Sequence, residues 1–210
     1  MKGTGVTADL DLDFIAHDDL RRQIAFFVEC DKMKSIQRRT QLIDGSRCEN
    51  DAEHSWELAL MAIVLQGYSN APVNMLRVLK MVIVHDIVEI DAGDTFIYDT
   101  EAGADQRDRE RTAADRIFGI LPEPQGREFR ALWEEFEARE TDDAKFARAL
   151  DRFQPLLHNF LTRGGTWRTP GVGPGEVLEK KRPISDGSDL LWSVTNDIVA
   201  EGVRRGYLRE

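Results

Sequence analysis

The chain has 210 residues, of which 41% are apolar and 31% are charged, and this composition is typical of one folded domain with a full hydrophobic core. Its 28 Lys and Arg residues against 38 Asp and Glu residues give a net charge of −10, so the surface as a whole repels a nucleic acid polymer. The apolar runs fall well short of the ~18 residues that cross a bilayer, so we expect no membrane segment.

The first 17 residues predict a flexible N-terminal arm, because they contain one early Lys and no apolar stretch like the core of a secretory signal. Cys30 and Cys48 are far apart and form no CxxC motif, which is typical of free thiols in a reducing compartment. We therefore expect a cytoplasmic protein in which residues 18–210 form one domain.

The first predicted helix begins after an N-cap at Asp18 or Asp19 and runs to about Cys30. Leu20, Ile24, Phe27 and Val28 repeat at helical spacing on it, which predicts a face in the core. Residues 31–50 lose this periodicity, so we interpret them as a loop with a short helical turn.

A second helix is predicted from a cap at Asp51 to about Gly67, with Leu58 and Ala62 on its apolar face. His54 lies in its first turn. Taken alone, this histidine suits a capping or surface role better than a metal site.

Pro72 is predicted to open a third helix, which is strongly apolar and leads directly into the stretch HDIVEIDAGD. His85 and Asp86 follow the apolar run at once, and an imidazole beside a carboxylate can bind one divalent transition metal. If the helix continues through residue 90, Glu89 shares their face. The alternative is a helix-end histidine that is hydrogen-bonded to a carboxylate for purely structural reasons.

Three further amphipathic helices are predicted at residues 101–119, 126–138 and 142–162, and no strand pattern is present. Asp151 lies in the last of them among apolar residues, where a carboxylate is costly unless it is paired or bound to metal. Residues 164–188 are rich in Gly and Pro and predict a long loop that is functional or mobile. A final helix, about 189–205, is expected to pack Leu190 and Leu191 into the core.

The order of His54, then His85 with Asp86, then Asp151 resembles that of the HD-domain metal-dependent phosphohydrolases. The local sequences AEHSW, KMVIVHDIVEIDAGD and ETDDAKFARALDRFQPLLHN are similar to the subgroup that contains the 5′-deoxynucleotidases, over roughly residues 20 to 205. The resemblance implies an all-α HD-domain helical bundle, with the long Gly/Pro-rich loop before the last helix. It also implies a homodimer, because dimers are usual among such relatives.

By this resemblance, His54, His85, Asp86 and Asp151 hold one divalent transition metal, namely Mn, Co, Fe, Ni or Zn. Glu89 then orients and deprotonates a metal-bound water. Asp94 either helps to protonate the leaving alkoxide, holds the sugar, or is merely a turn-forming residue after the helix.

The resemblance assigns the phosphate of a small substrate, a nucleoside 5′-monophosphate, to Arg39, with the adjacent Arg38 as an alternative. Thr40 replaces the aromatic residue that follows this arginine in the relatives. We therefore expect a weaker preference for deoxyribose, and a Thr40→Trp variant that prefers deoxyribose more strongly.

Two other functions are compatible with this fold. An HD-fold oxygenase needs a second metal and more ligands, and His158 lies seven residues beyond Asp151, about 10 Å along a helix and too far for the same ion. A non-catalytic, nucleotide-binding regulatory HD domain would be expected to lack a ligand or Glu89, and this chain has all of them.

Overall fold

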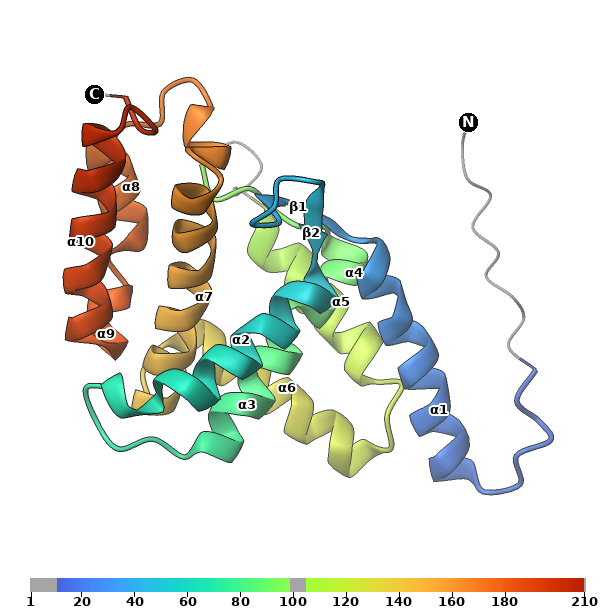
Figure 1. Cartoon of the computed structure of the whole chain (residues 1–210). Helices are drawn as coiled ribbons and strands as arrows, with labels where there is room; N and C mark the ends of the chain where they lie inside the picture. Colours follow the sequence, from blue (N-terminus) through green and yellow to red (C-terminus); the bar gives the residue numbers. More distant parts are fainter. Residues whose placement is uncertain (1–10, 99–104, 210) are drawn as a thin grey trace, which may run out of the picture.

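The computed structural model describes residues 11–98 and 105–209, and within these ranges the chain is helical apart from one short hairpin (Figure 1). The α-helices are α1 (Asp18–Cys30), α2 (Asp51–Leu65), α3 (Met75–Val84), α4 (Glu89–Ala92), α5 (Gln106–Phe118), α6 (Glu123–Ala138), α7 (Asp142–Leu161), α8 (Pro174–Lys181), α9 (Ile184–Gly187) and α10 (Asp189–Arg204). Turns of 3-10 helix are η1 (Asp31–Ser35), η2 (Gln66–Tyr68), η3 (His85–Val88) and η4 (Gly165–Arg168). The prediction of an all-α fold is confirmed.

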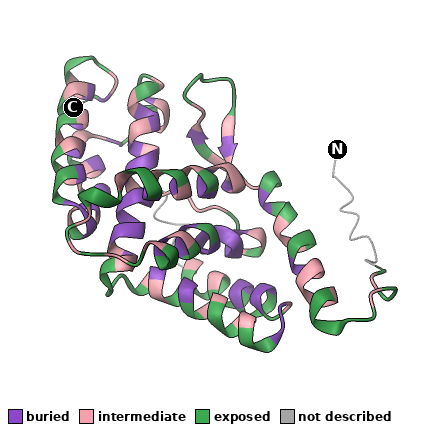
Figure 2. Ribbon diagram, turned by 60° about the horizontal axis from the view of Figure 1, so that its bottom comes forward, coloured by how far each residue is buried: buried purple, intermediate pink, exposed green. Residues whose placement is uncertain are grey.

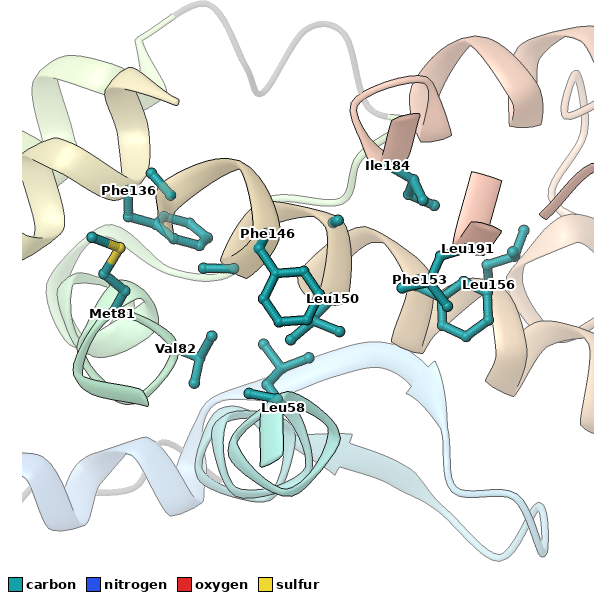
Figure 3. Packing of buried hydrophobic residues seen from close by; sticks show 14 of the residues in the cluster. Leu58, Met81, Val82, Phe136, Phe146, Leu150, Phe153, Leu156, Ile184 and Leu191 are labelled. Atoms are coloured by element: carbon teal, nitrogen blue, oxygen red, sulfur yellow. The ribbon is translucent and has the colours of Figure 1, made fainter. Parts of the chain in front are cut away.

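Helix α7 is the central element, because it packs against α2, α3 and α6 and also against α9 and α10 (Figure 1). Its buried side chains Phe146 and Leu150 meet Leu58 of α2 and Val82 of α3 in the main core (Figure 3). Most of α7 is purple in Figure 2, the colour of buried residues, whereas the helices at the edge of the molecule are buried along one stripe only. A polar side chain on α7 therefore lies next to packed structure on several sides.

A second core cluster lies beside α5. Ala114, Ile117 and Phe118 of α5 pack with Val88 of η3 and Trp133 of α6. Ile87 and Val88 of η3 belong to this cluster, whereas His85 of η3 contacts Phe136 of the main core, so the segment that follows α3 is held between two cores. The predicted helix at 101–119 is confirmed from residue 106 onward, and its first residues, 101–104, lie outside the described part of the chain.

The start of α2 differs from the prediction. Asn50, rather than Asp51, is the N-cap, and its side chain accepts from the backbone of Glu53 while the Glu53 carboxylate accepts from the backbone of Asn50. This reciprocal pair is a capping box, which satisfies two of the free N–H groups at the start of the helix. Asp51 does not cap the helix, and it is fully buried.

The helix that carries His85 also differs at both ends. Helix α3 begins after an Asn74 cap rather than at Pro72, and it does not continue regularly through residue 90. The chain tightens into the 3-10 turn η3 at His85 and returns to one α-helical turn at Glu89. Gly93 ends that turn with a positive φ of 77°, which glycine adopts without strain, and Asp94 follows it directly.

The segment 31–50 contains a hairpin that the sequence did not reveal. Strand β1 (Gln37–Gln41) pairs antiparallel with β2 (Cys48–Asn50), and an irregularity in the register separates the two ends of the pairing. Four of the five β1 residues are Gln or Arg and the fifth is Thr, so the strand lacks the alternation of apolar and polar residues that identifies strands. The predicted helical turn is present as η1.

Residues 164–188 are more ordered than a loop, so the prediction that they lack regular structure is wrong. They contain η4, the helix α8 and the short helix α9. Pro174 stands in the first turn of α8, where the missing N–H costs nothing. Gly187 allows α9 to touch α7, since a Cβ at this position would lie 2.3 Å from the Lys145 carbonyl oxygen.

The predicted core face of α1 is wrong. Phe26 is the buried residue of this helix, whereas Leu20, Phe27 and Val28 are exposed. Helix α1 packs lightly, against η1 and α5, at the edge of the molecule (Figure 1). Residues 11–17 precede it, and the first ten residues of the predicted N-terminal arm lie outside the described residues.

Helix α10 offers a matched pair that tests this packing. Leu191 is 5% exposed and belongs to the main core, whereas Leu190, predicted to be core, is 51% exposed. We expect Leu191→Ala to lower the free energy of unfolding by about 2–5 kcal/mol. Leu190→Ala should change it by no more than about 0.5 kcal/mol. Urea unfolding of both variants measures the difference, and equal losses would contradict the observed face of α10.

Candidate functional site

The two histidines His54 and His85 turn the same ring nitrogen toward one point. The Nδ1 atom of His85 is 3.0 Å from the carbonyl oxygen of Val82, which can only accept, so Nδ1 carries the proton. The Nδ1 atom of His54 is likewise 3.2 Å from the side-chain oxygen of Gln154. Each imidazole therefore has its Nε2 atom free to face the interior of the site.

Two carboxylates complete this group. Asp151 Oδ1 is 3.2 Å from His54 Nε2 and 3.8 Å from His85 Nε2. Asp86 lies 3.0 Å from His85 Nε2 through Oδ1 and 3.8 Å from His54 Nε2 through Oδ2. The predicted residues His54, His85, Asp86 and Asp151 thus come together from α2, η3 and α7, although nearly a hundred positions separate the first from the last.

The charges around this group favour a cation. Burial alone would raise the pKa of Asp151, but the two adjacent histidines and the nearby Arg148 and Arg152 hold this pKa well below its usual range. For His85, burial works against the charged form, yet Asp86 and Asp151 raise its pKa to about 10. The carboxylates therefore generate a strong negative potential at the Nε2 atom of His85.

The donor set fits a divalent transition metal. Among the described residues, the buried His85 Nε2 atom has no hydrogen-bond partner. One ligand atom each from His54, His85 and Asp151 lies within 4.8 Å of the other two. Imidazole nitrogen with carboxylate oxygen suits divalent transition metals, and a cation at this point would replace the unfavourable contact between bare nitrogen and carboxylate oxygen.

A second set of acids lies beside this group. Asp51, Asp86 and Glu89 each place one oxygen within 4.8 Å of the others. Burial is the main cause of the raised pKa of Glu89, and the negative charges of Asp86 and Asp51 add to it. Burial also raises the pKa of Asp94, which is half-buried. Glu89 keeps one carboxylate oxygen without a partner, so it can take part in proton transfer.

The group opens into a cleft of about 1040 Å³, which is large enough for a small organic substrate. Asp86, Glu89, Asp94 and Asp151 line it, and Arg38 reaches into it from β1. Basic side chains from α5, α7 and α8 also line the cleft, together with Arg139 at the end of α6, so the cleft suits an anion better than the net charge suggests.

Arg38 is the arginine that joins the acidic centre. Its Nη1 atom lies 2.8 Å from Asp86 and 3.1 Å from Asp51, and its Nε atom lies 3.4 Å from Glu49. Arg39 is not among the residues that line the cleft, and it stacks on the cleft-lining Phe96, 4.6 Å from the ring centre. Because neighbouring residues of a strand point to opposite faces, only one of the two arginines can face the site.

Thr40 does not line the cleft. Its side chain is 7% exposed and lies within the hairpin, so it has no surface on which a sugar could rest. The predicted roles of Thr40 in a sugar pocket and of Arg39 in phosphate binding stay predictions, and Arg38 is the one of the two arginines that lines the cleft. Without the hairpin, the sequence alone could not decide which of these adjacent residues faces inward.

Three other residues of the site were missed in the sequence. Glu49 and Asp51 are buried beside Arg38, and Gln154 is buried behind His54. Gln154 follows Asp151 by three positions on a helix, which puts both on one face, and this spacing was the available signal. For Glu49 and Asp51 the available signal was their position just before His54, although the local pattern predicts a loop residue and a helix cap there.

The comparisons with known proteins agree with this geometry. A family model described as HD domain matches residues 30–192. The crystal structure of a predicted metal-dependent phosphohydrolase from Magnetospirillum magnetotacticum MS-1 is 54% identical, with a TM-score of 0.88 over 92% of this chain and 97% of that one. The PH0347 protein from Pyrococcus horikoshii OT3 is 22% identical with a TM-score of 0.60 over 87% of this chain and 99% of that one, which shows the fold alone.

Among curated proteins, the 5'-deoxynucleotidase HDDC2 of Danio rerio is 31% identical over 109 residues, which are 52% of this chain and 53% of that protein. The chain therefore matches about half the length of such relatives. The family model spans most of the chain, including the segments that carry all four converging residues. The chain belongs to the HD domain family.

Proposed function

We propose that this protein is a metal-dependent phosphomonoester hydrolase that releases phosphate from nucleoside 5′-monophosphates. The observation that carries the proposal is the convergence of two Nε2 atoms and two carboxylates at the floor of an open cleft that has an arginine beside them. The similarity to a predicted metal-dependent phosphohydrolase and to 5'-deoxynucleotidases supports the same reaction class. Residues 18–210 form the proposed phosphohydrolase domain.

In this proposal, His54, His85, Asp86 and Asp151 hold one divalent cation, for which Mn, Co, Fe, Ni and Zn are the candidates. When bound, such a cation lowers the pKa of a coordinated water and polarises a phosphoryl oxygen. Asp151 can bind through one oxygen while the other faces Arg148, 3.3 Å away. This contact favours the ionised form of the Asp151 carboxylate and leaves its Oδ1 atom facing the two histidines.

Glu89 accepts the proton of the attacking water in this proposal. Its raised pKa makes it a stronger base than an ordinary carboxylate, and the charge of Arg38 keeps its ionised form accessible. Asp94, whose pKa is also raised, can return a proton to the leaving alkoxide or hold the sugar.

Arg38 is the proposed phosphate ligand, because its guanidinium lies in the cleft beside Asp86, one of the proposed metal ligands, and a guanidinium suits phosphate. We expect Arg38→Ala to lower kcat/KM by at least about 100-fold, the scale of losing a charged contact to the substrate worth about 3 kcal/mol. Arg39→Ala should leave kcat/KM close to that of the parent. Steady-state phosphate release from one nucleoside 5′-monophosphate measures both, and a larger loss in the Arg39 variant would reverse the assignment.

The proposed function is tested by metal analysis and by a panel of nucleoside monophosphate substrates. Metal analysis of the purified protein, followed by phosphate release from paired ribo and deoxy mononucleotides with several metals, should give one metal per chain and turnover. Two metals per chain would favour an HD-fold oxygenase. Metal or nucleotide binding without phosphate release would favour a regulatory HD domain.

A homodimer is the proposed assembly, formed by the outer face of α2. Trp56, Leu60, Ile63 and Val64 repeat at helical spacing there and are all exposed. Apolar patches of this kind mark protein interfaces. We expect Val64→Lys to shift the protein from dimer to monomer in sedimentation velocity, whereas Leu190→Lys on α10 should not. A parent protein that sediments as a monomer would contradict the dimer.

A cytoplasmic location is proposed on the basis of two unpaired cysteines, Cys30 and Cys48. In the described part of the chain, none of the helices combines the length and apolarity that a membrane span requires.

A further inference from the structure

A buried polar network lies behind His54, on the side away from the cleft, and Gln154 is its centre. This side chain is 0% exposed. Its oxygen is 3.2 Å from His54 Nδ1. Its nitrogen lies 2.8 Å from Glu49, 2.6 Å from Glu57 and 3.2 Å from His158 Nε2.

The neighbours of Gln154 determine which way its amide points. Glu49 and Glu57 are carboxylates that accept hydrogen bonds, so the NH2 group must face them and the carbonyl oxygen must face His54. An amide oxygen can only accept, so it selects the His54 tautomer with the proton on Nδ1. The Nε2 atom of His54 is then left as a bare lone pair toward the metal position.

The network is anchored on both flanks. Glu57 lies 3.0 Å from His158 Nε2, and His158 Nδ1 is 3.0 Å from the carbonyl oxygen of Gln41 on β1. Glu49, on β2, also lies 3.4 Å from Arg38. The hairpin therefore connects the support of His54 to the arginine of the cleft.

Glu49, Glu57 and His158 could themselves be considered a second cation site, because one ligand atom from each lies within 4.8 Å of the others. The distances argue against it. The Gln154 nitrogen is within hydrogen-bonding distance of all three side chains, so an NH2 donor already fills the position that a cation would need.

We propose that Gln154 is a positioning residue of the metal centre: its amide oxygen locks His54 in the Nδ1–H tautomer and holds Nε2 on the metal. The inference rests on the proposed metal site. A neutral amide performs this task without adding another negative charge to a region that already contains Glu49, Asp51, Asp86 and Asp151. Partners of this kind that orient a metal-binding histidine are worth about 10–100-fold in metal affinity.

The test compares Gln154→Leu, which removes the hydrogen bond, with Gln154→Glu, which retains an acceptor for His54. Leu156→Ala is the matched control, because Leu156 is buried on the same helix but belongs to the apolar core. Titration of each metal-free protein with Co²⁺ gives the affinity and stoichiometry. The NMR signal of His54 Nδ1–H in the Zn²⁺-loaded protein reports the tautomer and its protection from exchange.

We expect one Co²⁺ per chain in the parent, about 10–100-fold weaker binding in Gln154→Leu, and loss of the protected Nδ1–H signal in that variant. Gln154→Glu should bind Co²⁺ more tightly than Gln154→Leu, and Leu156→Ala should match the parent. Glu49 lies 3.8 Å from His54 Nδ1 and can replace the amide, so Gln154→Leu is also made together with Glu49→Gln.

Three results would overturn the inference. Equal Co²⁺ affinity in the parent and the Gln154→Leu/Glu49→Gln variant would show that Gln154 does not position His54. A second bound Co²⁺ that disappears in Glu57→Gln would show a cation site in place of the amide. A parent that binds no Co²⁺ would overturn the proposed metal site together with the inference, which distinguishes that failure from the first.

Discussion

Replacing Glu89 by Gln is expected to lower kcat for phosphate release by about 10²–10⁴-fold while the bound metal remains. The substitution keeps the size of the side chain and removes its ability to accept a proton. Glu89 lies with Asp51 and Asp86 rather than among the atoms that the two histidines face, so its loss should not disturb the metal.

The measurement combines kcat with metal content of the same preparation. Glu128→Gln is the matched control, because Glu128 is a surface residue paired with Lys80. It should retain both metal and turnover. Near-normal phosphate release from the Glu89 variant would show that this residue has only a structural role, and loss of metal from it would make it a ligand.

Asp86→Ala is expected to lose the metal, and phosphate release with it. Asp86 contacts His85, Arg38 and, at longer distance, His54, so one truncation removes a donor and leaves Arg38 with fewer acidic partners. Loss of a residue that only orients a metal ligand lowers metal affinity by about 10–100-fold, and loss of Asp86, a proposed ligand itself, should lower it further. Excess metal in the assay should restore activity only in part.

Metal analysis after dialysis measures this effect directly. Asp91→Ala is the control, because Asp91 is an exposed aspartate of α4 that pairs with Arg116 outside the cleft. It should keep a full equivalent of metal. If Asp86→Ala also kept a full equivalent, Asp86 would not be a ligand, and the three-residue set of His54, His85 and Asp151 would have to suffice.

Helices with a strong apolar period were predictable, since burial of one face imposes that period. Helices α2, α7 and α10 lie close to their predicted positions. The wrong predictions concern features that the neighbouring residues alone do not determine, namely the cap of α2 and the buried face of α1. Asn50 and Asp51 both suit a cap, and the tertiary contacts of Asp51 with Arg38 decide between them. The exposed apolar face of α1 has the pattern of a core helix and no core against it.

Three of the four proposed metal ligands are chemically conspicuous in the sequence: the His85-Asp86 pair follows an apolar helix, and Asp151 lies among apolar neighbours. His54 is assigned only by the family resemblance, because its place in the first turn of a helix favours a capping or surface role. The structure brings these residues together, and their role as ligands stays a prediction. Arg38 and Arg39 are equally basic and adjacent, so no property of the sequence separates them. The hairpin does, because its pairing turns one toward the acids and the other toward Phe96.

The sequence by itself therefore determined the all-α class, because apolar periodicity is a local property of the chain, and its resemblance to a known family named the residues proposed to bind a metal. Only the tertiary structure decided that Arg38 faces the cleft and that Gln154 stands behind His54. The orientation of a side chain depends on which distant groups surround it. The amide of Gln154 is turned by Glu49 and Glu57, each about a hundred positions away along the chain, and no local pattern records that distance.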